Sequence, residues 1–311
     1  MIAFGCAITK PEVYRTAAEV GIRRTAESDS EILASPSIGS IFASYNMLIE
    51  QASRRPGLEA LVLVHQDTEI VDHDFCERVR RTLADPEVGL VGCVGAIGVR
   101  SIAWWEGSVS AASFVHRFDD HGGGDLPAFS WAWDGAPPYA RNGEVDTLDG
   151  FLLVLSPWVV QNVRFDESLG QFHGYDLDFC LQVRAAGRKV VTADFRAVHH
   201  HSLKPFSDPE PWIEAHMRVA EKWDGVIPGV GTAAGSWEDR ALRAEAMRDA
   251  AKLHDHANGL KYAARVSELE HALAETTESI SWRITAPLRW VARALRRTPE
   301  RWRTPASVPP R

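Results

Sequence analysis

Residues 60–64, with the sequence ALVLV, form a run of five apolar residues that ends abruptly at His65-Gln66-Asp67. A continuous apolar run of this length is typical of a parallel strand that is buried on both faces. Polar residues directly after such a strand lie at its carboxyl end, where open α/β sheets bind their ligands. This segment therefore predicts an α/β fold and a candidate site immediately after the strand.

The segments around this strand alternate between strand-like and helix-like patterns. The predicted strands are residues 1–8, 30–34, 60–64, 88–94, 145–155, 163–165 and 189–193, and the predicted helices are 12–20, 41–53, 72–84 and 175–186. This alternation is typical of a mainly parallel sheet with helices on both faces.

The pattern of residues also divides the chain into parts. We expect a globular domain at residues 1–225, with an aromatic-rich insert at 100–145 that forms either a lid over the site or a satellite hydrophobic cluster. A Gly-rich link and a helical extension are expected at 226–278. Near-heptad apolar spacing in the extension favours either an α-helical hairpin or short coiled coil, or a helix packed on the domain. Self-association of residues 236–275 would make a homo-oligomer.

The net charge of −8 is distributed unevenly along the chain. Residues 280–311 contain eight arginines and one glutamate, a net charge of +7, which leaves −15 on the remainder. An acidic body argues against nucleic acid as a partner. Residues 279–311 predict a basic amphipathic tail that contacts the inner face of a membrane, with Trp282 and Trp290 as interfacial anchors. An ordinary surface helix is the alternative.

The cysteines and the apolar segments bear on the compartment. The cysteines lie among apolar residues without a CxxC pair, so we expect buried free thiols in a reducing compartment. The first apolar run lacks a charged segment before it, which favours a strand over a signal peptide. No apolar stretch approaches the ~20 residues of a membrane span. A cytoplasmic protein, with the tail as a peripheral membrane contact, is the expectation. The four cysteines are Cys6, Cys76, Cys93 and Cys180.

Acidic residues at predicted strand and helix ends are the first candidates for chemistry. Asp67 would ligate a divalent cation that bridges a diphosphate, or would cap the next turn. In Asp149-Gly150 the glycine permits close approach of a ligand, although a plain turn would use it as well. Asp176 and Asp178 do not share a helix face. One of the two would then act as a general base while the other caps backbone N–H groups, or both would be caps.

A run of three histidines follows the last predicted strand. If the strand continues, alternation directs His199 and His201 to one side and His200 to the other. Imidazole suits Mn²⁺ less well than oxygen does but is tolerated, so one histidine is a candidate metal ligand. A polar surface turn is the alternative.

The order of these segments, taken together, resembles the family 2 glycosyltransferases of the GT-A fold, in particular the subgroup named after StrF. The resemblance covers residues 1–205, about two-thirds of the chain. The tail stretch 281–289 is also similar to tails on bacterial glycosyltransferases. The matching stretches are SIFASYN (40–46), LVLVHQDTEI (61–70), VDTLDGFLLVLSP (145–157), VRFDES (163–168), FHGYDLDFCLQVRAAGRKV (172–190), VHHHS (198–202) and, in the tail, SWRITAPLR (281–289).

The resemblance implies a role for each matching residue. It implies a donor that is a UDP-, GDP- or dTDP-sugar, an acceptor that is a glycan, a lipid-linked molecule or a protein, and Mg²⁺ or Mn²⁺ as cofactor. The implied residues are Asp176 as the catalytic base, Asn46, Gln66 and Asp67 for the donor, Asp149, Gly150, Tyr175 and Asp178 for the acceptor, and Asp67, His199 and His200 for the metal.

Two residues depart from the family pattern. His65 stands at the first carboxylate of the DxD motif, and Tyr175 stands at the glutamate of the Glu-Asp motif. The StrF-like subgroup tolerates His-Gln-Asp, so these departures bear on metal dependence rather than on whether the chain is an enzyme.

The resemblance implies an inverting displacement. The metal would neutralise charge on the leaving nucleoside diphosphate, and Asp176 would take the proton of the acceptor hydroxyl. The tryptophans of the insert would stack on sugar faces and exclude water, namely Trp104, Trp105, Trp131 and Trp133.

Two other functions are considered. A sugar nucleotidyltransferase would need a Gly-rich, basic triphosphate loop near the first strand, and the sequence has none there. A non-catalytic module that binds nucleotide-sugars stays open because His65 replaces a carboxylate. Turnover distinguishes this module from a transferase.

Overall fold

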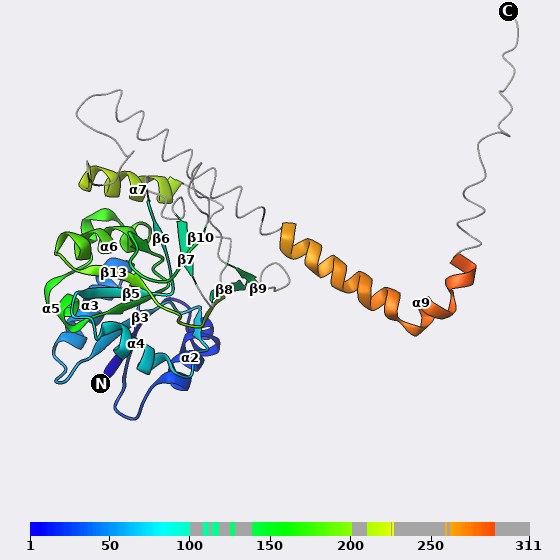
Figure 1. Cartoon of the computed structure of the whole chain (residues 1–311), viewed down its shortest axis with the longest axis horizontal. Coiled ribbons are helices and arrows are strands. Elements are labelled where there is room, and N and C mark those ends of the chain that lie inside the picture. Colours follow the sequence, from blue (N-terminus) through cyan, green and yellow to red (C-terminus); the bar gives the residue numbers. More distant parts are fainter. Residues whose placement is uncertain are drawn as a thin grey trace, which may run out of the picture. The chain divides into compact units, whose positions relative to one another are not determined.

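A computed structural model describes residues 1–99, 108–111, 114–117, 125–127, 139–200, 210–224, 226, 259 and 262–289. The chain forms two units, Met1–Lys261 and Tyr262–Arg311 (Figure 1). This division falls after Lys261, and the boundaries expected at residues 225 and 278 stay predictions. The tryptophans of the expected insert, Trp104, Trp105, Trp131 and Trp133, lie outside the described residues.

A six-stranded sheet in the order β13-β5-β12-β3-β1-β2 forms the centre of the first unit. Strand β12 runs antiparallel to both of its neighbours, and the other neighbouring pairs are parallel. The mainly parallel sheet expected from the buried run at residues 60–64 is therefore confirmed. The six strands are β1 (Ile2–Ile8), β2 (Glu31–Pro36), β3 (Ala60–Val64), β5 (Val88–Gly92), β12 (Leu152–Leu155) and β13 (Lys189–Thr192).

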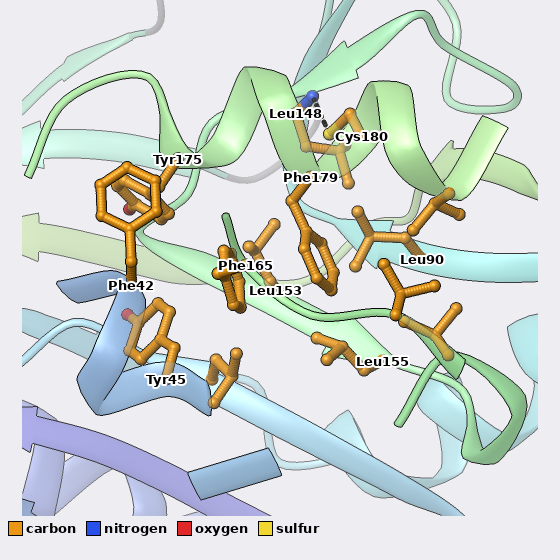
Figure 2. Close-up of a cluster of buried hydrophobic side chains, with 14 of the residues drawn as sticks. Phe42, Tyr45, Leu90, Leu148, Leu153, Leu155, Phe165, Tyr175, Phe179 and Cys180 are labelled. Atoms are coloured by element: carbon orange, nitrogen blue, oxygen red, sulfur yellow. Dashed lines mark hydrogen bonds between the residues drawn. The ribbon is translucent and has the colours of Figure 1, made fainter. Parts of the chain in front are cut away.

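Helices cover both faces of this sheet because successive strand residues point to opposite sides. Leu61 and Leu63 of β3 join one hydrophobic cluster, and Val62 and Val64 join the other. Figure 2 shows part of the first cluster. The first cluster includes residues of α3 (Ile41–Ser53), α5 (Pro157–Asn162), α6 (Tyr175–Ala185) and α7 (Glu210–Lys222), and the second includes residues of α1 (Pro11–Thr16), α2 (Ala18–Thr25) and α4 (Phe75–Leu83).

Two four-stranded sheets flank the central one. In the second of them, β14 pairs antiparallel with β4, which places His199 opposite Thr68. The histidine run is thereby brought beside the residues that follow β3. The first flanking sheet has the order β10 (Tyr139–Ala140), β7 (Ser108–Ala111), β6 (Val94–Ile97), β11 (Thr147–Leu148), and the second β4 (Thr68–Ile70), β14 (Ala197–His200), β8 (Phe114–Arg117), β9 (Asp125–Pro127).

Several expected elements are interrupted. The strand expected at residues 145–155 is two strands, β11 and β12, which belong to different sheets. The strand expected at 88–94 likewise passes from β5 to β6 at Cys93. The expected helix at 12–20 breaks at Ala17, whose φ of −121° and ψ of −80° are not helical. Residues 163–165 are irregular and not a strand.

Two helices, α5 and α7, lie outside the expected set. A local signal exists for α5, because Ser156 caps it by accepting from the backbone N–H of Val159 and Pro157 stands in its first turn. All four cysteines are buried free thiols, as expected from their apolar surroundings.

The second unit is helical where it is described. Residues 262–278 are helical, and α9 (Ile280–Ile284) follows. Large apolar residues along the described part of the second unit are solvent-exposed. Within the described part of the chain, no helix combines the length and the apolar character needed to cross a membrane. The exposed apolar residues are Tyr262, Val266, Leu269, Leu273, Ile280, Ile284 and Leu288.

Candidate active site and metal cluster

The turn after β3 is fixed by Gln66. The side-chain carbonyl oxygen of Gln66 accepts hydrogen bonds from the backbone N–H groups of Thr9 (2.9 Å) and Lys10 (2.8 Å), and its amide donates to the Thr9 hydroxyl (2.7 Å). These bonds join the loop after β1 to the loop after β3. We therefore interpret Gln66 as a residue that positions Asp67, and not as a group that faces the donor.

Strand β14 carries two histidines with different surroundings. Nε2 of His199 lies 3.4 Å from Oδ1 of Asp67, whereas Nε2 of His200 lies 3.2 Å from Oε2 of Glu69. The alternation expected for the histidine run holds for these two residues, and His201 lies outside the described part. Among the described residues, His200 pairs with Glu69 of β4 and is not in the cluster around Asp67, and its expected metal role stays a prediction.

His65, Asp67 and His199 form the candidate metal cluster. Each offers one ligand atom, and these atoms lie within 4.8 Å of one another. Nδ1 of His65 is 4.0 Å from Oδ1 of Asp67. Two imidazole nitrogens and one carboxylate oxygen are suitable donors for a divalent metal ion, so the cluster fits the cofactor that the sequence predicts.

The two histidines of the cluster differ in their affinity for protons. Burial lowers the pKa of His65 to about 4, so its ring is neutral at pH 7 and keeps a lone pair for a metal. Burial also lowers the pKa of His199, but the negative charges of Asp67 and Asp149 outweigh it, and the net shift is upward. A metal ion would compete with protons for a ring nitrogen of His199, because a histidine ligates metals in its neutral form.

The first turn of α6 holds the expected base. Oδ2 of Asp176 accepts from the backbone N–H of Gly150 (3.1 Å), and Oδ1 accepts from that of Leu177 (2.9 Å). Burial, and then the negative charge of Asp149, raise the pKa of Asp176 to about 7. A carboxylate with this pKa is suited to take a proton from a hydroxyl near neutral pH.

Asp149 precedes β12 beside this base. Burial raises the pKa of Asp149, and the charge of His199 opposes the shift. Its Oδ1 accepts from the backbone N–H of Phe151 (3.3 Å). The ring of Phe151 stacks on that of His199, with centroids 4.6 Å apart. The residues between β11 and β12 thus contact both Asp176, through Gly150, and His199, through Phe151.

Tyr175 lies between α3 and the turn after β3. Its side chain is 4% exposed, and its ring packs on those of Phe42, Tyr45 and Phe165 (Figure 2). Its hydroxyl is 2.6 Å from Nε2 of His65. A Cβ atom at Gly150 would lie only 2.1 Å from this hydroxyl. Gly150 is therefore required to make room for Tyr175, a reason that the sequence did not reveal.

Asp178 is a structural residue. It is 0% exposed, and its carboxylate accepts from Gln182 (2.7 Å) and from the indole N–H of Trp223 (2.8 Å). It also pairs with Lys222 at 2.8 Å. These contacts hold the carboxylate against α7 and the residue that follows it, and the expected acceptor role of Asp178 stays a prediction.

Asn46 holds a loop against α3. Its amide donates to the backbone oxygen of Phe165 and to Glu167 (both 2.9 Å), and its carbonyl oxygen accepts from the backbone N–H of Phe165 (2.8 Å). The side chain thus bonds within the protein, and its donor role stays a prediction.

His65 was not among the metal ligands expected from the sequence, although its position two residues before Asp67 was a signal.

Comparisons with known proteins assign the chain to a family. A family model described as a glycosyltransferase-like family matches residues 10–217. The chain is 25% identical over 235 residues to the streptomycin biosynthesis protein StrF of Streptomyces griseus, covering 73% of this chain and 76% of that protein. It is 27% identical over 184 residues to the O-antigen biosynthesis protein RfbC of Myxococcus xanthus, covering 57% of this chain and 14% of that protein.

Among solved structures, the mannosyltransferase PcManGT from Pyrobaculum calidifontis, in complex with GDP-Man and Mn²⁺, aligns with a TM-score of 0.43 and 11% identity. The alignment covers 95% of this chain and 86% of that one. The matched residues include the His65–Asp67–His199 cluster and the expected base Asp176. Because it spans more than half of the sequence, the chain belongs to the glycosyltransferase-like family.

Proposed function

We propose that this glycosyltransferase moves a sugar from a nucleotide-sugar donor to an acceptor hydroxyl with inversion, and that Asp176 is the general base. The observation that carries the proposal is the carboxylate of Asp176, whose pKa is raised to about 7 beside the His65–Asp67–His199 cluster. A base and a group that receives the leaving diphosphate are the two requirements of a direct displacement.

The residues of the site divide the work. Asp176 accepts the proton of the attacking hydroxyl, while the N–H of Gly150 holds one oxygen of its carboxylate in place. His65, Asp67 and His199 would hold Mg²⁺ or Mn²⁺, which when bound neutralises negative charge on a nucleoside diphosphate. Asp149 lies near His199 and raises the pKa of Asp176.

The substrates are proposed from the family and the relatives. The relatives are named for streptomycin biosynthesis and O-antigen biosynthesis. A role in glycan or glycoconjugate biosynthesis is the corresponding proposal for this chain. The donor would be a UDP-, GDP- or dTDP-sugar, and the acceptor a glycan, a lipid-linked molecule or a protein.

The second unit supports a peripheral membrane location. Ile280, Ile284 and Leu288 are spaced by four residues and are more than 70% exposed. The guanidinium of Arg289 lies 3.7 Å from the ring centroid of Trp282. An apolar stripe next to arginine and tryptophan suits the interface of an anionic membrane. Buried free thiols agree with a cytoplasmic location.

A homo-oligomer through residues 236–275 is proposed on narrower grounds. Of this segment, residues 262–275 are described, and they expose Val266, Leu269 and Leu273 at spacings of three and four. This spacing matches one seam of a coiled coil.

The test is release of nucleoside diphosphate from a panel of UDP-, GDP- and dTDP-sugars, with and without Mn²⁺ and an acceptor. Asp176→Asn should lower turnover about 10²- to 10⁴-fold because the amide cannot take the proton. Its thermal stabilisation by the donor should persist. Asp85→Asn, the same chemical change at a surface residue paired with Lys189, is the matched control.

Equal turnover by Asp176→Asn and the wild type would refute the role of Asp176. Thermal stabilisation by one donor, with no nucleoside diphosphate released from any donor, would indicate the non-catalytic module.

A further inference from the structure

The two residues that depart from the family pattern contact each other. Nε2 of His65 and the hydroxyl oxygen of Tyr175 are 2.6 Å apart, although the residues are 110 positions apart in sequence. His65 follows β3, and Tyr175 is the first residue of α6. An imidazole and a phenol thus form a hydrogen bond where the family motif has two carboxylates.

This hydrogen bond leaves the other ring nitrogen of His65 for the metal cluster. Nδ1 lies on the side of Asp67, at 4.0 Å from Oδ1. Histidines that ligate metals donate their other N–H to an oxygen, which fixes the orientation of the ring. A hydroxyl both donates and accepts, so Tyr175 accepts from Nε2–H whenever Nδ1 gives its lone pair to a metal.

The position of the Tyr175 hydroxyl is itself constrained. The ring lies among Phe42, Tyr45 and Phe165, and the hydroxyl occupies the space that a side chain at Gly150 would fill. The Tyr175 hydroxyl, which is the partner of His65, is therefore held in place by the packing of its own ring.

We propose that His65, Asp67 and His199 form a site with two imidazoles and one carboxylate that binds Co²⁺ and Zn²⁺, and Mn²⁺ less tightly, in preference to Mg²⁺. Tyr175 is its positioning residue. Mg²⁺ prefers oxygen ligands and sheds water reluctantly. Imidazole nitrogens favour first-row transition metals, with affinity rising from Mn²⁺ to Co²⁺. The inference deepens the proposed function by naming the class of metal that the same site selects.

The experiment titrates the full chain with each metal alone, without nucleotide, by calorimetry and by the visible absorption of bound Co²⁺. One Co²⁺ per chain is expected, with an affinity at least about 100-fold above that for Mg²⁺. Tyr175→Phe keeps the ring, and should lower Co²⁺ affinity about 10- to 100-fold and alter the Co²⁺ spectrum. His271→Ala, at an exposed residue paired with Glu275 in the second unit, should match the wild type.

Gly150→Ala provides a second variant that keeps the hydroxyl but displaces it, and it should weaken Co²⁺ binding in the same direction. The proposal is overturned if the wild type binds no metal, if Mg²⁺ binds as tightly as Co²⁺, or if Tyr175→Phe and Gly150→Ala bind Co²⁺ like the wild type. It is equally overturned if His271→Ala weakens binding as much as Tyr175→Phe. No donor or acceptor is present, so these outcomes are distinct from failure of the transferase assay.

Discussion

Opposing interactions set the pKa of Asp176. Burial and the charge of Asp149 raise its pKa, and the N–H groups of Leu177 and Gly150 lower it. The result, about 7, lies well above the ordinary value for an aspartate. Because this pKa lies near neutral pH, a small change in the surroundings of Asp176 changes the fraction of molecules in which its carboxylate is ionised.

The pH dependence of turnover follows from this pKa. Only the ionised carboxylate accepts a proton, so kcat/KM should fall about tenfold per pH unit below pH about 7 and level off above it. Initial rates at subsaturating donor between pH 5 and 9 would measure the profile. A rate independent of pH between 5 and 8 would contradict the assignment of Asp176.

Residue type and order pointed to Asp67, just beyond a strand, to Asp176, at a helix start, and to the histidine run that includes His199, and the roles of these residues stay predictions. Residue type alone did not reveal the surroundings of Asp178. Its partner Trp223 comes from 45 positions further along the chain, and nothing local to Asp178 reports that contact. Gly150 is similar, because the atom that excludes a side chain there belongs to Tyr175.

At the scale of elements, α6 is held to α7 by one buried carboxylate. Asp178 has no exposed surface, and its partners are Lys222 at the end of α7 and Trp223 just after it. Because α6 also begins with Tyr175 and Asp176, this contact supports the helix that carries the base.

Asp178→Ala should therefore lower the free energy of unfolding by about 2–4 kcal/mol, because it removes the buried acceptor of the Trp223 indole N–H and leaves Lys222 with its other partner, Asp166. Urea denaturation would measure the loss. Glu214→Ala removes an exposed pair with Arg218 on α7 and should change stability by less than about 1 kcal/mol. Equal losses of stability in the two variants would show that the buried contacts of Asp178 stabilise the fold no more than the exposed Glu214–Arg218 pair does.

The sequence predicted most of the central sheet and four of its covering helices, because buried strands and amphipathic helices have distinct apolar periods. It did not predict where a strand leaves one sheet for another. Residues 88–94 stay apolar through the break at Cys93, so their pattern continues where the pairing changes. In residues 145–155 the break falls at Asp149-Gly150, which marks a candidate turn but does not show that the strands on its two sides join different sheets. Helix α7 was missed for a different reason, since it follows a stretch with no strand signal.

At the scale of the whole molecule, the site and the tail belong to different units. All residues of the metal cluster and the base lie in Met1–Lys261, and the exposed stripe of Ile280, Ile284 and Leu288 lies in Tyr262–Arg311. Chemistry and membrane contact should therefore be separable.

A chain ending at Lys261 should keep donor turnover with a water-soluble acceptor, and should lose binding to vesicles that contain phosphatidylglycerol. Vesicle sedimentation with the full chain and with phosphatidylcholine vesicles provides the comparison. In the full chain, Arg283→Ala with Arg289→Ala should weaken binding by about 1 kcal/mol per arginine. Sedimentation of the shortened chain with anionic vesicles would rule out the tail as the membrane contact.

The hydrogen bond between His65 and Tyr175 has a consequence for how such a site changes in evolution. A mutation at either position alone leaves a partner without its bond, and a mutation at Gly150 displaces both. The three positions lie in separate segments, yet a substitution at one of them changes the bonding or the packing of another. Exchange of this pair for two acidic residues would therefore have to change both positions together to avoid leaving one partner without its bond.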